Sequence, residues 1–180
     1  MSRAPTGSQT VGPFFKLGLS WLYTREIGAA ALSGRHVELR GHVYDGLGRP
    51  IPDALLEFWQ ADANGLYHTE AGAEFMGFAR VPTDADGVFE LRTVKPGRVG
   101  GRSGQLQAPH LNVYVFMRGL LLPLLTRMYF PDEPVNAEDP VLALVPEARR
   151  ETLIARSSAA GVLEWDIHTQ GDREIVCFVA

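Results

Sequence analysis

The sequence predicts an all-β protein: a β-sandwich of mostly antiparallel strands with long loops and one or two short helices. Its hydrophobic segments are short and alternate apolar with polar residues, which is typical of strands buried on one side. They are separated by turn sequences rich in glycine, proline, asparagine and aspartate, such as DANG, TDADG and KPG. The length of 180 residues suits one domain with a hydrophobic core, so we expect residues 1–180 to form a single domain.

The strand pattern can be followed along the chain. HVELRGHVY, residues 36–44, places Val37, Leu39, Gly41 and Val43 on one face. By similar patterns, strands are also expected over residues 54–61, 88–94, 110–118, 162–169 and 173–180.

The remaining segments predict loops and little helix. Residues 139–153, DPVLALVPEARRETL, are the best helical candidate, expected as one or two short turns around Pro146. Residues 98–108 are glycine-rich but lack a following Gly-Lys-Ser/Thr, so they indicate a loop and not a nucleotide site. Residues 1–35 are rich in small residues and proline near their start and indicate an irregular N-terminal arm.

Composition excludes several partners. The net charge is −4 and no run of basic residues exceeds the pair Arg149–Arg150, so no nucleic acid is expected. The most apolar window, residues 113–130, is interrupted by Arg118, Pro123 and Arg127, so no membrane span is expected. The single cysteine, Cys177, is expected to be buried and excludes an intrachain disulfide. Without a signal-peptide pattern, these features indicate a cytoplasmic protein.

Five phrases resemble one family in order and over most of the chain. They are SQTVGPFF, GHVYDGLGRPIPDALLEFWQADANGLY, TDADGVFELRTVKPG, APHLNVYVFMRG and TRMYFPDEP. Together they resemble the intradiol ring-cleaving dioxygenases. More narrowly, the chain resembles the α chain of a two-chain member. The resemblance implies a homologous, iron-binding β subunit as partner, in a higher αβ oligomer.

The resemblance also implies where iron ligands would stand. In the family, the iron-bearing chain holds Fe(III) with two tyrosines and two histidines, and oxygen and nitrogen donors suit this ion. The matching positions here are Tyr67, Val99, His110 and Asn112, so one phenol and one imidazole are replaced. This implies a vestigial site without metal and without catalytic residues, while the partner subunit binds Fe(III). Tyr67 and His110 are then expected to be structural, bonded to each other or to backbone.

Arg118 lies at the far end of the predicted strand 110–118. Eight residues at about 3.3 Å each separate it from His110 by roughly 26 Å, so the two cannot serve one pocket. From the residues alone, Arg118 would be a solvated strand-end arginine or would pair with Asp132 or Glu133. The family resemblance implies instead that it binds the carboxylate of an aromatic acid, which a guanidinium recognises with charge and paired donors.

The segment SQTVGPFF resembles a part of the α chain that lines the same pocket. This resemblance implies that Thr10, Gly12 and Pro13 bind substrate from the N-terminal arm. Thr10 would supply a hydroxyl, Gly12 a close backbone approach and Pro13 a fixed chain direction. The aromatic residues Phe14, Phe15 and Trp21 are expected to anchor the arm in a hydrophobic contact.

The implied function is that of an enzyme subunit. With O2, the assembled enzyme would cleave protocatechuate between its two hydroxyls to 3-carboxy-cis,cis-muconate, and this chain alone would be inactive. Two alternatives stay open. One is a self-sufficient homomeric catechol-type dioxygenase, against which the missing phenol and histidine argue. The other is a non-enzymatic β-sandwich binding module, which would be stable as a single chain, whereas a subunit would expose an apolar surface.

Overall fold

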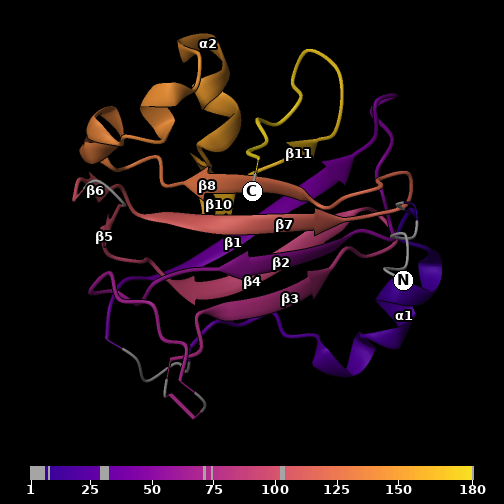
Figure 1. The fold of residues 1–180 in the computed structure, drawn as a ribbon, viewed down its shortest axis with the longest axis horizontal. Helices are drawn as coiled ribbons and strands as arrows, with labels where there is room; N and C mark the ends of the chain where they lie inside the picture. Colours follow the sequence, from indigo (N-terminus) through magenta and orange to yellow (C-terminus); the bar gives the residue numbers. More distant parts are fainter. Residues whose placement is uncertain are drawn as a thin grey trace, which may run out of the picture.

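A computed structural model describes residues 7, 9–28, 33–70, 72–73, 75–101 and 104–179. Figure 1 shows strands gathered in the middle of the molecule, with short helices at its periphery. The first sheet has the order β3-β2-β7-β8 and is antiparallel throughout. Its strands are β2 (Leu55–Trp59), β3 (Phe78–Pro82), β7 (His110–Phe116) and β8 (Leu124–Tyr129).

The second sheet is built around β1 (His36–Tyr44), which pairs antiparallel with β4 (Val88–Val94). Two short strands, β10 (Leu163–Glu164) and β11 (Ile167–His168), run parallel to β1, and β9 (Arg156–Ser157) pairs with β10. The inward positions of β1 are buried and alternate with exposed ones over most of the strand. The all-β class, the mostly antiparallel pairing and the few short helices are therefore confirmed.

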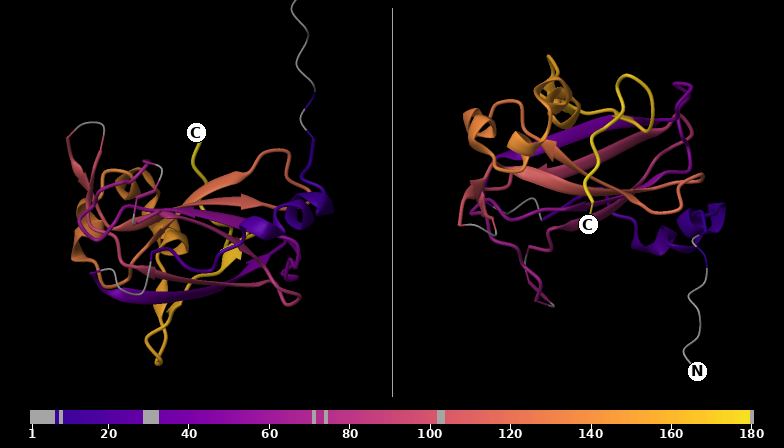
Figure 2. Two further views of the ribbon diagram at one scale, coloured as in Figure 1. Left: turned by 90° about the horizontal axis from the view of Figure 1, so that it is seen from below. Right: turned by 45° about the horizontal axis from the view of Figure 1, so that its top comes forward.

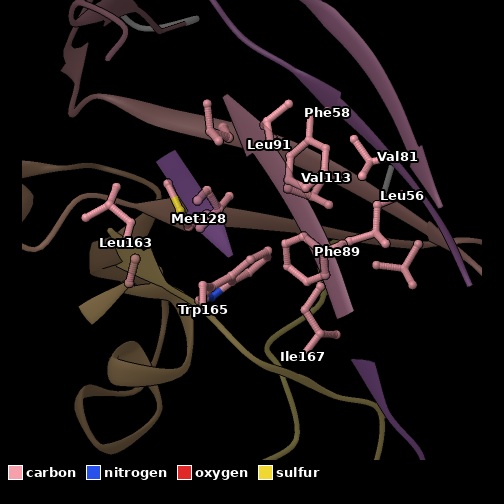
Figure 3. Close-up of a cluster of buried hydrophobic side chains, with 14 of the residues drawn as sticks. Leu56, Phe58, Val81, Phe89, Leu91, Val113, Met128, Leu163, Trp165 and Ile167 are labelled. Carbon is pink, nitrogen blue, oxygen red and sulfur yellow. The ribbon is translucent and has the colours of Figure 1, made fainter. Parts of the chain in front are cut away.

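The core lies between the two sheets. In Figure 3, side chains of β2, β3 and β7 face those of β4 and of the C-terminal strands. The ring of Phe58 on β2 lies 5.9 Å from that of Phe89 on β4, and Trp165 meets Phe89 edge-on at 6.5 Å between centroids. These large side chains are almost fully buried, and aromatic pairs of this geometry add to the stabilisation that apolar burial gives.

The predicted strand 162–169 is interrupted at Trp165. The amide of Trp165 donates to the carbonyl of Arg40 at 3.0 Å, and its own carbonyl lies over Gly41. A Cβ on Gly41 would stand 1.8 Å from that oxygen, so a glycine is required for the close approach. The chain is thus divided into β10 and β11.

Several boundaries differ from the predictions. Strands β3 and β8 were not expected, and the predicted strand 110–118 ends at Phe116, before Arg118. Within 173–179 the chain makes only isolated bridges, through Glu174 and Phe178, and Cys177 is exposed instead of buried. The predicted loop 98–108 contains a short hairpin, whose two strands, β5 (Val99–Gly100) and β6 (Leu106–Gln107), have two residues each.

The helices are short. The predicted turns around Pro146 are present as η3 (Leu142–Leu144), α2 (Glu147–Arg150) and η4 (Glu151–Leu153), after η2 (Pro134–Glu138). The N-terminal arm, expected to be irregular, contains α1 (Pro13–Gly18) and η1 (Ser20–Leu22). Both views in Figure 2 show α1 at one side of the sandwich, close to one end of the sheets. Within the described ranges, no helix is long and apolar enough to cross a bilayer.

Candidate functional site

The predicted site residues gather at opposite ends of β7. His110 begins this strand, and Arg118 comes two residues after its end at Phe116. In Figure 1 the start of β7 lies beside β5 and β6, and its end lies on the side of α1. The predicted separation into two places therefore holds. We refer to the His110 end, with Tyr67, Val99 and Asn112, as the vestigial site, and to the Arg118 end as the arginine edge.

At the vestigial site, His110 is 3% exposed. Its Nδ1 lies 2.7 Å from the carbonyl oxygen of Ala108, which can only accept, so Nδ1 carries a proton and donates. Burial, reinforced by the positive charge of Arg127, lowers the pKa of His110 to about 4. The ring is therefore neutral at pH 7 and keeps its lone pair on Nε2, which is the tautomer of a metal-binding histidine held by a backbone carbonyl.

Tyr67 is positioned by the turn DANG. The carboxylate of Asp62 accepts hydrogen bonds from the amides of Asn64 and Leu66, both at 2.9 Å, and Gly65 takes a positive φ of 84°. A Cβ on Gly65 would lie 1.9 Å from the carbonyl oxygen of Arg98. The turn therefore rests directly against the chain that follows KPG.

The Tyr67 ring stacks on Trp59 with 5.9 Å between centroids, and its hydroxyl accepts a hydrogen bond from Nδ2 of Asn112 at 3.0 Å. Burial raises the pKa of Tyr67, so the phenol stays protonated at pH 7. Its partner is a side chain and neither His110 nor the backbone, which corrects that expectation for Tyr67. For His110 the expected backbone bond is present.

Val99 lies on β5, where it is 6% exposed and pairs with Gln107 of β6. It offers no donor atom, and the amide of Asn112 is already bonded to Tyr67. Two side chains with donors suited to ferric iron remain at the matched positions, Tyr67 and His110. Within the part of the chain that the structure describes, no three His, Cys, Asp or Glu side chains converge in a metal-binding group. This donor set does not fit a ferric ion.

Sequence reasoning missed Arg127, which faces the vestigial site from β8. It pairs in register with Asn112, so the two side chains share a face of the sheet. Its Nη1 donates to Oε1 of Gln107 at 2.6 Å and to the hydroxyl of Tyr129 at 3.4 Å. The signal was present in the sequence as an arginine inside the apolar window, but it was interpreted only as an obstacle to membrane insertion.

Behind Arg127, a buried hydrogen-bond network closes the site. The Tyr129 hydroxyl donates to Oδ1 of Asp139 at 3.1 Å, and burial raises the pKa of Tyr129. Asp139 is fully buried and accepts amide hydrogen bonds from Ala108 at 2.7 Å and Leu142 at 2.7 Å. This carboxylate therefore ties η3 to the start of β7, where His110 is held.

At the arginine edge, the guanidinium of Arg118 is largely solvent-exposed. Its Nε lies 3.2 Å from Oδ1 of Asp53, yet that oxygen has no partner with hydrogen-bond geometry in the described residues. Of the two alternatives that the residues alone left open for Arg118, a solvated side chain or a pair with Asp132 or Glu133, the structure does not show the second. Both of those acids contact Lys95, at 3.0 Å and 2.5 Å, because they follow β8 at the opposite end of the sheet.

The N-terminal arm reaches the arginine edge. The Thr10 hydroxyl oxygen accepts a hydrogen bond from the amide of Gly119 at 2.8 Å, next to Arg118. Gly12 precedes α1 and Pro13 begins it, so the structure brings all four predicted residues into one region. No atom of the described chain lies within 4 Å of the Cβ position of Gly12, so nothing within this chain requires glycine there.

The aromatic residues of the arm divide into two groups. Phe15 packs on Phe116 at the end of β7, with 5.1 Å between ring centroids, and anchors the arm as expected. Phe14 and Trp21 are 81% and 78% exposed, so they do not anchor it within this chain. Lys16 adds a polar anchor, since its Nζ donates to the carbonyls of Pro52 and Thr83 at 2.6 Å.

A separate hollow of about 560 Å³ lies over β1 and β4. Its charged walls are paired with one another: Arg92 lies 3.1 Å from Glu38, and Arg40 lies 3.9 Å from Glu90. None of the predicted site residues lines it. The hollow therefore adds nothing to either end of β7.

Comparisons with known proteins identify the family of this chain. The family model described as dioxygenase matches residues 24–171. The chain is 45% identical to the protocatechuate 3,4-dioxygenase alpha chain of Burkholderia cepacia, covering 96% of each. It is 34% identical to the beta chain from the same organism, over 69% of this chain and 57% of that one. The dioxygenase domain of a carbohydrate-binding fusion from Streptomyces sp. SirexAA-E has a TM-score of 0.64 and 28% identity, covering 81% of this chain and 85% of that one. The chain therefore belongs to the intradiol ring-cleaving dioxygenase family.

Proposed function

We propose that this chain is the alpha subunit of a protocatechuate 3,4-dioxygenase and works with a homologous, iron-bearing beta subunit in a higher αβ oligomer. The observation that carries this proposal is its similarity to an alpha chain over nearly the whole length of both proteins. The assembled enzyme uses O2 to cleave protocatechuate between its hydroxyls, and both oxygen atoms enter the product 3-carboxy-cis,cis-muconate.

Iron in this proposal belongs to the beta subunit. The vestigial site keeps one phenol and one imidazole, and Tyr67 is bonded to Asn112. Ferric iron needs anionic oxygen donors to balance its charge, and burial keeps the Tyr67 phenol protonated. The chain therefore supplies no catalytic residue of its own.

The contribution of this chain lies at the arginine edge. The Arg118 side chain is 65% exposed, and among the described residues it makes only the loosely aligned contact with Asp53, so its donors are available to a ligand. A guanidinium binds a carboxylate with two parallel hydrogen bonds, which fits the acid group of protocatechuate. We assign Thr10, Gly12 and Pro13 to the wall of the same pocket, which the beta subunit completes with its iron.

An exposed apolar face beside this edge supports assembly with a partner. On the N-terminal arm, Phe14, Leu17 and Trp21 are 81%, 66% and 78% exposed. Leu121 and Leu122, which follow Arg118 in the chain, are 61% and 70% exposed. Large apolar side chains of this kind mark protein interfaces when they gather in one region. We place the beta subunit over this face, with residues 1–35 contributing to the contact, in a single-domain cytoplasmic subunit.

The test is reconstitution. This chain, a candidate beta chain and their mixture are each assayed for O2 uptake with protocatechuate, and complex formation is followed by size-exclusion chromatography. The proposal predicts a stable complex that is active, with this chain inactive alone. Turnover by this chain alone would support a homomeric dioxygenase. A monodisperse single chain that never binds the beta chain would support a binding module.

A further inference from the structure

Arg127 lies on the same face of the first sheet as residues of the vestigial site. It shares a face of the first sheet with Asn112 and, one pair further along, with His110 and Tyr129. Tyr67 lies over the same face, because its hydroxyl is bonded to Asn112 and its ring stacks on Trp59, the β2 residue paired with Asn112. The guanidinium therefore lies among the residues that occupy the ligand positions.

The guanidinium is held firmly and without a counter-ion. Its contacts in the described part of the chain are Oε1 of Gln107 at 2.6 Å, the Tyr129 hydroxyl at 3.4 Å and the ring of Phe178 at 5.9 Å, none of them charged. The nearby carboxylate of Asp139 is bonded to the Tyr129 hydroxyl and to backbone amides. The positive charge of Arg127 is thus fixed in place and is not neutralised by a direct ion pair.

This charge acts on both remaining donors. Burial lowers the pKa of His110 and the charge of Arg127 lowers it further, whereas burial raises the pKa of Tyr67 and the charge of Arg127 offsets only part of that rise. The guanidinium and the two donors lie on one face of the sheet, as the strand register and the hydrogen bond between Tyr67 and Asn112 place them. A ferric ion at this place would meet a fixed like charge in a half-buried environment, where repulsion is weakly screened.

We infer that Arg127 is the built-in cation of the vestigial site: its guanidinium takes over the electrostatic role of a metal and excludes metal ions from the space beside Tyr67 and His110. The inference rests on the proposed function in one respect, since it takes this chain to be free of iron. It goes further, because it states that the loss of two donor side chains is not the whole reason why the vestigial site lacks a metal. Restoring those two donors is then not sufficient to restore a metal site.

The test restores the donors and then varies the charge. The full chain with Val99→Tyr and Asn112→His is compared with the same chain carrying Arg127→Gln or Arg127→Lys. A matched control carries Arg92→Gln, which removes one positive charge from the exposed face of β4. Each is dialysed against ferric nitrilotriacetate, and iron per chain and visible phenolate-to-iron absorbance are measured.

We expect Arg127→Gln to raise iron affinity at least tenfold over the parent double variant. Arg127→Lys and Arg92→Gln should remain within twofold of that parent. Equal iron affinity in all four proteins, whether all bind or none does, would overturn the inference. Iron uptake by the unmodified chain would instead overturn the proposed function, so the two failures are distinguishable.

A second arm avoids placing a tyrosine at the buried Val99. Asn112→His alone, on a half-buried strand position, is compared with Asn112→His plus Arg127→Gln, using Co(II) as probe and its visible bands as readout. Circular dichroism confirms that both variants fold. At least tenfold tighter Co(II) binding after removal of the guanidinium is expected, and affinities within twofold of each other would contradict the inference.

Discussion

At the His110 end of β7 the polar side chains are bonded to one another, whereas at the Arg118 end they are left open. Asp139, Tyr129, Arg127 and Gln107 form a continuous chain of contacts behind His110. In the part of the chain that the structure describes, Arg118 has only the loosely aligned contact with Asp53, and the arm beside it presents exposed apolar residues. The polar groups at the His110 end thus have partners within this chain, whereas the Arg118 end is left open to a ligand or a partner.

Under the proposed function, this difference separates an end of the strand without a metal from an end that meets the substrate and the partner. At the closed end, hydrogen bonds from Asp139 through Tyr129 and Arg127 to Gln107 hold the polar side chains in place. The open end has surplus donors and apolar surface, which are the features of an interface and a ligand pocket. Variants at the closed end should therefore change stability, and variants at the open end should change substrate binding.

The largest expected effect is at Asp139. Asp139→Ala would leave the Tyr129 hydroxyl and the amides of Ala108 and Leu142 without their partner in a buried site. We expect the free energy of unfolding to fall by about 4 kcal/mol. Urea unfolding measures this, with Glu138→Ala as control, because that neighbouring side chain is 71% exposed. A loss below about 1 kcal/mol would show that the network does not hold the closed end.

His110 should make stability depend on pH. Its pKa of about 4 in the folded chain lies below the 6.5 of an ordinary histidine, so between these values the unfolded chain binds more protons. The free energy of unfolding should therefore decrease as pH falls through this window, by about 2 kcal/mol between pH 7 and pH 5. Urea unfolding at both pH values should show this loss reduced in His110→Gln. An unchanged pH dependence in that variant would mean that His110 is not buried as a neutral ring.

Arg118 should affect substrate binding and not stability. In the assembled enzyme, Arg118→Leu should raise KM for protocatechuate roughly tenfold to a hundredfold, the scale of one lost charged hydrogen bond. Arg118→Lys keeps the charge without the paired donors, so its KM should lie between those of the unmodified enzyme and the Arg118→Leu variant. Steady-state kinetics with catechol, which lacks the carboxylate, is the control. Unchanged KM for protocatechuate would remove Arg118 from the pocket.

Thr10 should give the smallest effect. Thr10→Val removes the acceptor for the Gly119 amide but keeps the side-chain shape, so it would loosen the turn that carries Arg118. We expect a KM increase of about fivefold, the scale of about 1 kcal/mol, with kcat little changed. Thr10→Ser, which restores the hydroxyl, should recover most of the loss. An increase that serine does not reverse would point to packing instead of this hydrogen bond.

The sequence allowed much of the fold to be predicted, since alternation and turn chemistry are local signals. Strands β1 and β4 begin or end beside the turns DGLGRPIPD, TDADG and KPG, and were expected with their observed bounds. β8 was missed because its alternation is weak, with Leu124, Leu125 and Arg127 all partly buried. The C-terminal segment has the pattern of a strand, but it touches two different edge strands, β11 through Glu174 and β8 through Phe178, and follows neither, so it makes only isolated bridges.

The site residues also differ in how far the sequence could predict them. Tyr67, Val99, His110 and Asn112 were named from the family resemblance, whose quoted motifs carry these positions. The roles of Arg127 and Asp53 depend on contacts between distant parts of the chain: Arg127 meets Gln107, and Asp53 meets Arg118. Such pairings arise from sheet register and from packing of the arm, which a single sequence does not encode as a motif.

The most direct test of the account is the iron content and visible absorbance of this chain, purified alone and then in complex with a beta chain. A closed vestigial site and an open arginine edge predict a colourless, iron-free chain that becomes part of a coloured, iron-containing and active complex. Stoichiometric iron with phenolate-to-iron absorbance in the isolated chain would contradict it, and would return Tyr67 and His110 to the role of ligands.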